Sequence, residues 1–193
     1  MTCVVGLVGT GDEVGSLLLA ADSAGVVRGE EIYSLRNQKV FRSGAYLLGF
    51  TTSFRLGQVV RFGAELPEPP PELLSSEGGS GVEIEGFLAT DFVGALRRAL
   101  ADHGHDQAFS SGGSLLVGVA GRLFVLGKDY QVLAAREPYA AIGSARLLAY
   151  GALAAMADLE TTALGLERRA RIALQVAERF SPEVRSPFDL VGV

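Results

Sequence analysis

The order in which strand-like and helix-like stretches follow one another constrains the fold of this chain more than any other feature. Short apolar runs typical of strands come in two main blocks, and each block is followed by two stretches whose apolar residues recur at helical spacing. The predicted strands cover residues 3–9, 16–21, 38–42, 45–50, 114–120, 122–126, 130–134, 139–142 and 188–191, and the predicted helices cover 52–66, 86–103, 145–158 and 161–180. This segregation favours an α+β fold with two antiparallel sheets and helix pairs outside them.

Four segments carry more specific expectations. The helix over 145–158 is apolar nearly all round, so we expect it to be buried on most sides. Thr161 or Thr162 is expected to cap the last helix. Residues 25–36 combine glycines with an acidic pair and predict no regular element. The Pro-, Gly- and Ser-rich stretch 67–83 predicts an exposed connection that is not a domain linker.

The composition is that of one soluble globular domain spanning residues 1–193, with 48% hydrophobic and 20% charged residues. A net charge of −5 without a basic stripe argues against a nucleic-acid partner. Cys3 is the only cysteine, which excludes an internal disulfide. Without a long apolar run or a signal-peptide pattern, we expect no membrane partner and a cytoplasmic location. His103 and His105 have no further ligands nearby, so neither a metal nor a cofactor is expected.

The N-terminus carries the residue with the most specific chemistry. Thr2 follows Met1, and its side chain is small enough for methionine aminopeptidase to remove the methionine. The mature chain would then begin with a hydroxyl nucleophile and a free α-amine base on one residue. Because an α-amine has a pKa of about 7.7–8, a useful fraction is neutral and can accept the hydroxyl proton. A Met-Thr start is common, so this interpretation needs support from the rest of the chain.

Such a nucleophile needs a nearby cation, an anion that fixes the cation, and N–H donors for the developing oxyanion. Asp22, Lys39 and Gly49 lie where consecutive strands of one sheet could bring them together. Each also has a structural alternative: Asp22 as a turn former at a strand end, Lys39 as a solvated lysine, and Gly49 as a site of close packing. Cys3 should point away from Thr2 and serve as a small core residue.

Together these residues resemble the proteasome β-subunit and HslV-type peptidase branch of the N-terminal-nucleophile (Ntn) hydrolases. Members of that branch have a Thr, a strand pair ending in Ala-Asp, a strand with Lys, an Ala-Gly step before the first helix, and a Gly-Ser step before a later apolar helix. The matching segments here are Thr2, Ala20-Ala21-Asp22-Ser23, Gln38-Lys39-Val40, Leu48-Gly49-Phe50 and Ala141-Ile142-Gly143-Ser144. The resemblance spans nearly the whole chain and implies a four-layer αββα sandwich.

The resemblance also implies a role for each matching residue. Thr2 would be the nucleophile and its α-amine the base. Lys39 would lower the pKa of that amine and orient the hydroxyl, and Asp22 would hold Lys39. The N–H of Gly49 would form the oxyanion hole. Ser144 would hydrogen-bond near the Thr2 amine, although an N-cap role remains an alternative for this serine.

The sequence departs from the family pattern in a longer spacing from Thr2 to Asp22, through extra residues around Gly9–Gly15, and in two motifs. Thr51-Thr52-Ser53 replaces the usual Gly-Asp pair after the oxyanion strand. Glu183-Val184-Arg185-Ser186 stands where many members carry Asp-x-x-Ser, so the roles of Glu183 and Ser186 stay open. By family position, Leu47 and Phe41 would line an apolar pocket for the side chain before the scissile bond.

The expected function is amide-bond hydrolysis by a threonine-type peptidase through an acyl-enzyme on Thr2. Two alternatives remain open: a non-catalytic scaffold or assembly subunit of the same fold, and an Ntn amidase acting on a small metabolite. The apolar helix over 145–158 and the family's habit of forming rings both favour a homo-oligomer. An ATPase unfoldase partner is an option that the family suggests and the sequence does not support.

Overall fold

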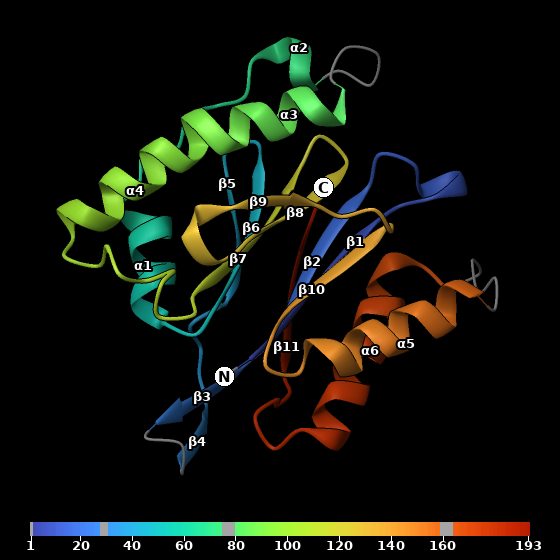
Figure 1. Ribbon diagram of the computed structural model, residues 1–193. Helices are drawn as coiled ribbons and strands as arrows, with labels where there is room; N and C mark the ends of the chain where they lie inside the picture. The colour runs from blue at the N-terminus through green and yellow to red at the C-terminus, as the bar shows by residue number, and fades with distance from the viewer. Residues whose placement is uncertain (1, 28–30, 75–79, 159–163) are drawn as a thin grey trace.

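Two antiparallel sheets lie face to face in the computed structural model, which describes residues 2–27, 31–74, 80–158 and 164–193 (Figure 1). The first sheet has the strand order β10-β1-β2-β11 and the second the order β5-β6-β7-β8-β9. Their strands are β1 (Cys3–Val8), β2 (Leu17–Asp22), β5 (Val40–Ser43), β6 (Tyr46–Thr51), β7 (Ser114–Val119), β8 (Arg122–Leu126), β9 (Val132–Ala134), β10 (Tyr139–Gly143) and β11 (Phe188–Gly192). Each lies where the sequence predicted a strand.

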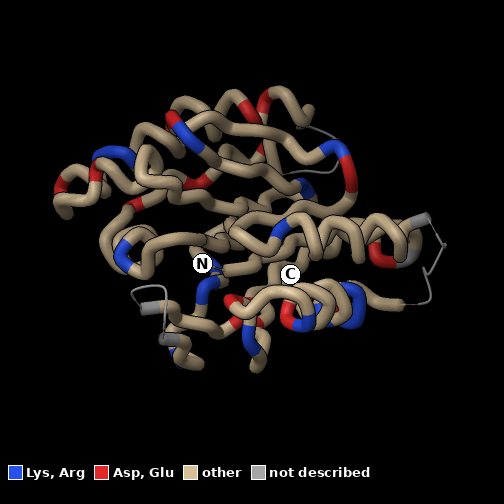
Figure 2. The backbone as a smooth tube through the Cα atoms, turned by 60° about the horizontal axis from the view of Figure 1, so that its bottom comes forward, with Lys and Arg blue, Asp and Glu red and all other residues tan. Residues whose placement is uncertain are grey.

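Helices cover the outer faces of both sheets and complete four layers (Figure 1). Those on the second sheet are α1 (Phe54–Phe62), α3 (Gly81–Phe87) and α4 (Val93–Asp102), and those on the first are α5 (Arg146–Asp158) and α6 (Leu166–Phe180). Lys, Arg, Asp and Glu lie mainly on the helices and the connecting loops (Figure 2). The predicted α+β architecture, an αββα sandwich, is therefore confirmed.

Burial on both faces explains why the strand sequences are apolar without strict alternation. Successive side chains of a strand point to opposite faces, so Cys3 and Val5 of β1 pack against α5 and α6 while Val4 packs against the second sheet. The core between the sheets consists of Val4, Leu17, Leu19, Ala21, Val40, Leu47, Leu116, Leu123, Ala140 and Ile142. This apolar layer fixes the position of one sheet against the other, and with it the residues at the strand ends.

One hairpin lies where the sequence predicted no regular element. β3 (Ala24–Val27) and β4 (Glu31–Ser34) form an antiparallel pair separate from the two sheets. The glycines and acidic residues of this stretch lower its strand propensity, which hid the pair from pattern analysis. Gly25 leaves room for the side chain of Leu35, whose Cδ1 would lie 2.4 Å from a Cβ at position 25.

The connection predicted over 67–83 contains helical residues. A short α2 (Pro71–Leu74) lies within it, and α3 begins at Gly81 instead of residue 86. The earlier start follows from a capping box, in which the Ser80 hydroxyl accepts from the Glu83 N–H and the Glu83 carboxylate accepts from the Ser80 N–H. A π-helical turn over Leu88–Phe92 joins α3 to α4, and 3-10 turns occupy Gly11–Glu13 and Lys128–Tyr130.

The last helix begins later than predicted. α6 starts at Leu166 with Gly165 at its N-cap, so the prediction that Thr161 or Thr162 caps it is wrong. Those two threonines lie outside the described residues. The predicted core stripe of α6 is buried, and it consists of Leu166, Ala170, Ala173, Leu174 and Ala177. Within the described ranges, no helix has the length and apolar character that crossing a membrane requires.

The prediction that α5 is buried on most sides is confirmed only in part for a single chain. Ala149 and Leu153 are fully buried against the first sheet and α6. Leu147, on another side of the helix, is 71% exposed. Five more apolar residues of the helix are partly buried against the same core: Leu148, Tyr150, Ala152, Ala154 and Met156. The helix therefore exposes only one side of its apolar surface.

Candidate active site

Three of the predicted site residues meet at one end of the first sheet. Thr2 directly precedes β1, Asp22 is the last residue of β2, and Ser144 directly follows β10. Because β1 pairs with β2 on one side and with β10 on the other, these ends lie together. Gly143 permits the approach of β10, since it has φ +103° and a Cβ there would lie 2.1 Å from the Thr2 carbonyl oxygen.

Lys39 reaches this point from the opposite sheet, because it directly precedes β5. The expectation that consecutive strands of one sheet bring Asp22 and Lys39 together is therefore wrong. Lys39 Nζ lies 2.9 Å from Asp22 Oδ2 and 3.0 Å from Oδ1. It also donates to Thr2 Oγ1. With Lys39 3% and Asp22 0% exposed, the ion pair is buried between the sheets directly against the threonine hydroxyl.

The Asp22 carboxylate has hydrogen-bond donors beyond the lysine. Its Oδ1 accepts from the Thr2 hydroxyl and the Cys3 N–H, and its Oδ2 accepts from the Ala24 N–H, each at 2.9 Å. These bonds offset the cost of burying the ion pair, which is several kcal/mol per ion without partners. Burial lowers the pKa of Lys39 below its usual value of 10.5, and the neighbouring Asp22 opposes that shift. The Thr2 hydroxyl thus has fixed contacts to both members of the ion pair.

The Thr2 nitrogen faces a different group. It donates to Ser144 Oγ at 3.3 Å, and Ser144 Oγ donates to Glu183 Oε2 at 2.7 Å. In the structure this nitrogen belongs to the Met1–Thr2 peptide and stands in for the α-amine of the processed chain. Glu183, whose role the sequence left open, therefore joins the site through Ser144.

The same region shows what Ser186 contacts and whether Ser144 caps α5. Ser186 has a contact elsewhere, since its backbone N–H donates to Glu178 Oε1 at 2.7 Å. Ser144 lies one position too early for the N-cap of α5, which begins at Arg146. The Ser144 hydroxyl is instead engaged by Thr2 and Glu183.

Gly49 does not reach the site. It lies in the middle of β6, and a Cβ at this position would meet Val4 Cγ1 at 2.6 Å in the core between the sheets. The residue that sequence reasoning missed is Thr52, which follows β6 and lines the space beside Thr2. The backbone of Thr52 has a φ of 76°. Its backbone conformation is one that glycine favours, so a threonine there gave no signal. The available clue was the replacement of the family's Gly-Asp pair.

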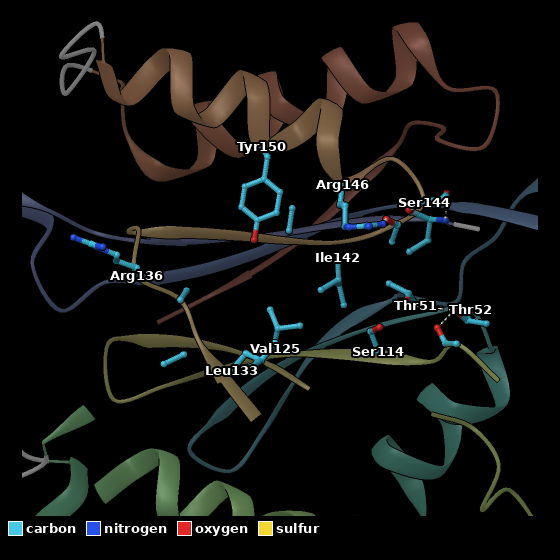
Figure 3. Close-up of a pocket in the computed structure, with 16 residues that line it drawn as sticks. Thr51, Thr52, Ser114, Val125, Leu133, Arg136, Ile142, Ser144, Arg146 and Tyr150 are labelled. Atoms are coloured by element: carbon cyan, nitrogen blue, oxygen red, sulfur yellow. Dashed lines mark hydrogen bonds between the residues drawn. The ribbon is translucent and has the colours of Figure 1, made fainter. Parts of the chain in front are cut away.

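Two cavities open at Thr2, Thr51 and Thr52. The larger, of about 740 Å³, is also lined by Gly112, Ser114, Val125, Leu133, Ala134, Ala135, Arg136, Ala141, Ile142, Gly143, Ser144, Arg146 and Tyr150 (Figure 3). The smaller, of about 40 Å³, is also lined by Val26, Lys39, Phe50, Ser53 and Phe54. Leu47 and Phe41, the expected pocket residues, line neither cavity and are buried in the core.

The cysteine and the two histidines considered in the sequence analysis contact other parts of the fold. Burial raises the pKa of the Cys3 thiol to about 12, and its side chain packs toward α5 and α6 as expected of a core residue. His105 Nε2 lies 3.2 Å from Ser53 Oγ, and His103 Nδ1 lies 2.8 Å from the Ala99 carbonyl oxygen. Among the residues that the structure describes, no three His, Cys, Asp or Glu side chains are grouped to hold a metal ion.

Solved structures share this fold over its full length. BPH of Thiobacillus denitrificans in complex with epoxomicin matches with a TM-score of 0.74 and 23% identity, covering 98% of this chain and 97% of that chain. HslV from Trypanosoma brucei matches with a TM-score of 0.64 and 17% identity, covering 98% of both chains. Anbu, an ancestral β-subunit from Yersinia bercovieri, matches with 0.61 and 18%, covering 100% of this chain and 81% of that chain.

No protein-family model matches the sequence, and no curated protein matches it by sequence. The structural matches therefore define the fold: this chain has the fold of the proteasome-like Ntn hydrolases. That agrees with the resemblance that the sequence motifs suggested.

Proposed function

We propose that the chain is a threonine-type amide-bond hydrolase, a proteasome-like peptidase whose nucleophile is Thr2 after removal of Met1. The observation that carries the proposal is the set of contacts around one residue. Buried Lys39 donates to the Thr2 hydroxyl, Asp22 fixes Lys39, and the Thr2 nitrogen contacts Ser144. One domain over residues 1–193 supplies these groups, and the proposed reaction uses water and no cofactor.

The reaction proceeds in two half-reactions. In the first, Thr2 Oγ1 attacks the amide carbonyl carbon and the hydroxyl proton passes to the α-amine. The C–N bond then breaks, and the protonated α-amine of Thr2 gives this proton to the nitrogen of the leaving group. In the second, water attacks the ester carbon while the α-amine of Thr2 takes a proton from that water. The bond to Oγ1 breaks, the proton returns to Oγ1, and the carboxylic acid leaves.

Lys39 favours the reactive forms of both groups on Thr2. Its positive charge lowers the pKa of the α-amine, which keeps that base neutral, and it stabilises the alkoxide that develops on Oγ1. Asp22 opposes the effect of burial on the lysine's pKa, which favours the charged form of Lys39. Asp22 therefore acts through Lys39, as a positioning residue.

We assign the oxyanion donor to the backbone N–H of Thr52 in place of Gly49. Thr52 lines both cavities beside the nucleophile, and no hydrogen bond of its N–H occurs within the described part of the chain. A left-handed backbone costs a non-glycine residue about 1–2 kcal/mol, and such strain persists where surrounding contacts hold it. Here the Thr52 hydroxyl donates to the Gly112 carbonyl oxygen at 2.9 Å.

Glu183 orients Ser144 in this account. Its carboxylate accepts the Ser144 hydroxyl proton at 2.7 Å, which leaves a lone pair of Ser144 Oγ for the Thr2 nitrogen. The negative charge of Glu183, close to the future α-amine, favours the protonated amine and so opposes the effect of Lys39. The pair of opposed charges would set the pKa of the base.

The two alternatives differ from this proposal in what they require. A scaffold or assembly subunit has no need of a buried ion pair directed at the Thr2 hydroxyl, and the Lys39–Asp22 pair is complete. An amidase for a small metabolite needs a pocket within one chain. The cavity of about 740 Å³ lies in the size range of small-molecule sites, so peptides and small amides should both be assayed.

The test compares Thr2→Ala with Thr2→Ser on peptides and on small amides. Thr2→Ala removes the nucleophilic oxygen together with one methyl group, so we expect the rate to fall at least about a thousandfold with the circular dichroism spectrum unchanged. Thr2→Ser keeps a hydroxyl, and serine is small enough for Met1 still to be removed. This variant should therefore retain hydrolysis. Full activity of Thr2→Ala on any amide would show that Thr2 is not the nucleophile.

The predicted homo-oligomer, including a ring, stays a prediction. The exposed apolar side of α5, with Leu147 71% exposed, supports self-association. Light scattering on the purified protein tests it, with Leu147→Glu as the variant expected to lower the mass. An unchanged mass for this variant would show that Leu147 is not at a subunit contact.

A further inference from the structure

The direction of proton transfer distinguishes the two cavities at Thr2. The Thr2 hydroxyl contacts Lys39, which lines the smaller cavity, and the Thr2 nitrogen contacts Ser144, which lines the larger one. In the proposed reaction, the protonated α-amine gives its proton to the leaving nitrogen. The leaving group must therefore depart on the side that the amine faces, so the larger cavity receives the leaving-group half of the substrate.

The lining of the larger cavity is apolar with a positive charge. Val125, Leu133 and Ile142 contribute apolar side chains to it (Figure 3). Arg136 and Arg146 are its charged residues, and none of the described lining residues is acidic. In the described part of the chain, neither arginine has a carboxylate within 4.0 Å. The cavity thus carries positive charge in a chain whose net charge is −5.

Arg146 is the arginine placed at the reacting centre. As the first residue of α5, it donates from Nη1 to the Gly143 carbonyl oxygen at 3.2 Å. Its side chain extends toward Ser144, whereas that of Arg136 extends away from it (Figure 3). A guanidinium has five N–H donors, so the one hydrogen bond that it donates within the described part of the chain leaves Arg146 able to bind a further acceptor. Arg146 and Thr2 both line the larger cavity, so those donors face the same space as the nucleophile.

We propose that the larger cavity binds a leaving group that carries a carboxylate, and that Arg146 binds this carboxylate. An arginine matches a carboxylate in planar, two-bond geometry, which an amide of the same shape cannot reproduce. The carboxylate belongs either to an acidic side chain close after the scissile bond or to the substrate's C-terminus. The proposal rests on the proposed function, because it uses the α-amine of Thr2 as the proton donor.

The test uses matched peptides that share the acyl half and differ only in the leaving group. A peptide library digested by the processed protein and analysed by mass spectrometry supplies the acyl half. The leaving groups compared are Gln-Gly-amide, Glu-Gly-amide and Gln-Gly with a free C-terminus. For the wild-type protein we expect kcat/KM to be about tenfold higher for at least one carboxylate peptide than for the neutral one, as for a charge-assisted hydrogen bond.

Variants assign the preference to one side chain. In Arg146→Gln the ratio of kcat/KM for the carboxylate and neutral peptides should fall to about one, and Arg146→Lys should restore part of it. Arg98→Gln removes the same charge from the exposed surface of α4 and should keep the tenfold ratio. Which of the two carboxylate peptides is preferred identifies the source of the carboxylate.

Two outcomes would overturn the proposal: equal hydrolysis of all three peptides by the wild-type protein, or a preference that survives in Arg146→Gln. Epoxomicin labelling of the wild-type protein separates this failure from failure of the proposed function. An adduct at Thr2 together with equal hydrolysis contradicts only the role of Arg146. Absence of an adduct from the processed protein contradicts the nucleophile itself.

Discussion

The two sides of Thr2 are built in different ways. On the hydroxyl side, Asp22 comes from the first sheet and Lys39 from the second, and both are buried. Both oxygens of the Asp22 carboxylate accept hydrogen bonds. On the nitrogen side, Ser144 is exposed and Glu183 is half-buried, and the larger cavity opens beside them. Both sides contain a carboxylate, yet only one carboxylate is sealed from water.

The difference separates two tasks within one site. A buried ion pair is costly to disturb, so the hydroxyl side holds the nucleophile in one position. The open side can exchange protons and admit a leaving group, because its groups are solvated and a cavity adjoins them. The same change of carboxylate to amide should therefore have very different consequences at Asp22 and at Glu183.

Asp22→Asn should have the largest effect on stability. It leaves the Lys39 ammonium buried without its counterion, and breaking a buried pair costs about 3–5 kcal/mol. We expect the free energy of unfolding, measured with urea, to fall by that amount, together with a loss of hydrolysis. A loss no larger than that of Glu183→Gln would show that the two sides do not differ as described.

Gly49→Ala and Thr52→Gly distinguish a packing position from a site position. A Cβ at Gly49 would lie 2.6 Å from Val4 Cγ1, so Gly49→Ala should lower stability by about 1–3 kcal/mol through overpacking. Thr52→Gly relieves the φ of 76° and keeps the backbone N–H, so hydrolysis should persist. Urea unfolding and kcat/KM for both variants check this pair. A stable Gly49→Ala protein would contradict the core position.

The pH dependence of Lys39 reports on the sealed side. Burial lowers its pKa below 10.5, so kcat/KM should fall as the pH rises through that lowered value and the cation is lost. The sequence has two lysines, so NMR of the ¹³C-labelled ε-carbons can follow Lys39 directly, with Lys128→Arg to assign the signals. In Asp22→Asn the pKa should fall further, because Asp22 raises it. A Lys39 pKa at or above 10.5 would contradict the effect of burial.

Glu183→Gln should have the smallest effect. The amide can still accept the Ser144 hydroxyl proton, and Glu183 is only half-buried, so stability should change by less than about 0.5 kcal/mol, as for most surface substitutions. Removing the negative charge should lower the pKa of the Thr2 α-amine, so the acid limb of kcat/KM should move to lower pH. An acid limb that stays in place would show that Glu183 does not influence the amine.

The sequence predicted the fold because its signals were local and agreed with each other. Apolar runs marked the strands, and helical periodicity marked the core stripes of α4 and α6. The β3–β4 hairpin was missed because its glycines and acidic residues have low strand propensity, so its pairing could not be read from the pattern. The start of α6 was misplaced because threonine and glycine are about equally common at the N-cap, so capping preference alone could not point to Gly165.

The site was predictable where residue type alone defines the chemistry. The structure brings Thr2, Asp22, Lys39 and Ser144 together, and their catalytic roles remain predictions. Gly49 was a poor choice because an oxyanion donor is a backbone N–H, which any residue other than proline can supply. Thr52 and Glu183 depend on backbone conformation and on long-range contacts, such as the 39-residue separation of Ser144 and Glu183, that periodicity does not encode.

The most direct test of the central claim is the intact mass of the native protein before and after incubation with epoxomicin, an epoxyketone that forms a ring with an N-terminal threonine. We predict loss of Met1 and a single adduct that Thr2→Ala abolishes. Burial and a pKa of about 12 keep the Cys3 thiol from competing for the epoxide. A protein that has lost Met1 and forms no adduct would contradict the account, and retained Met1 without an adduct would favour the scaffold alternative.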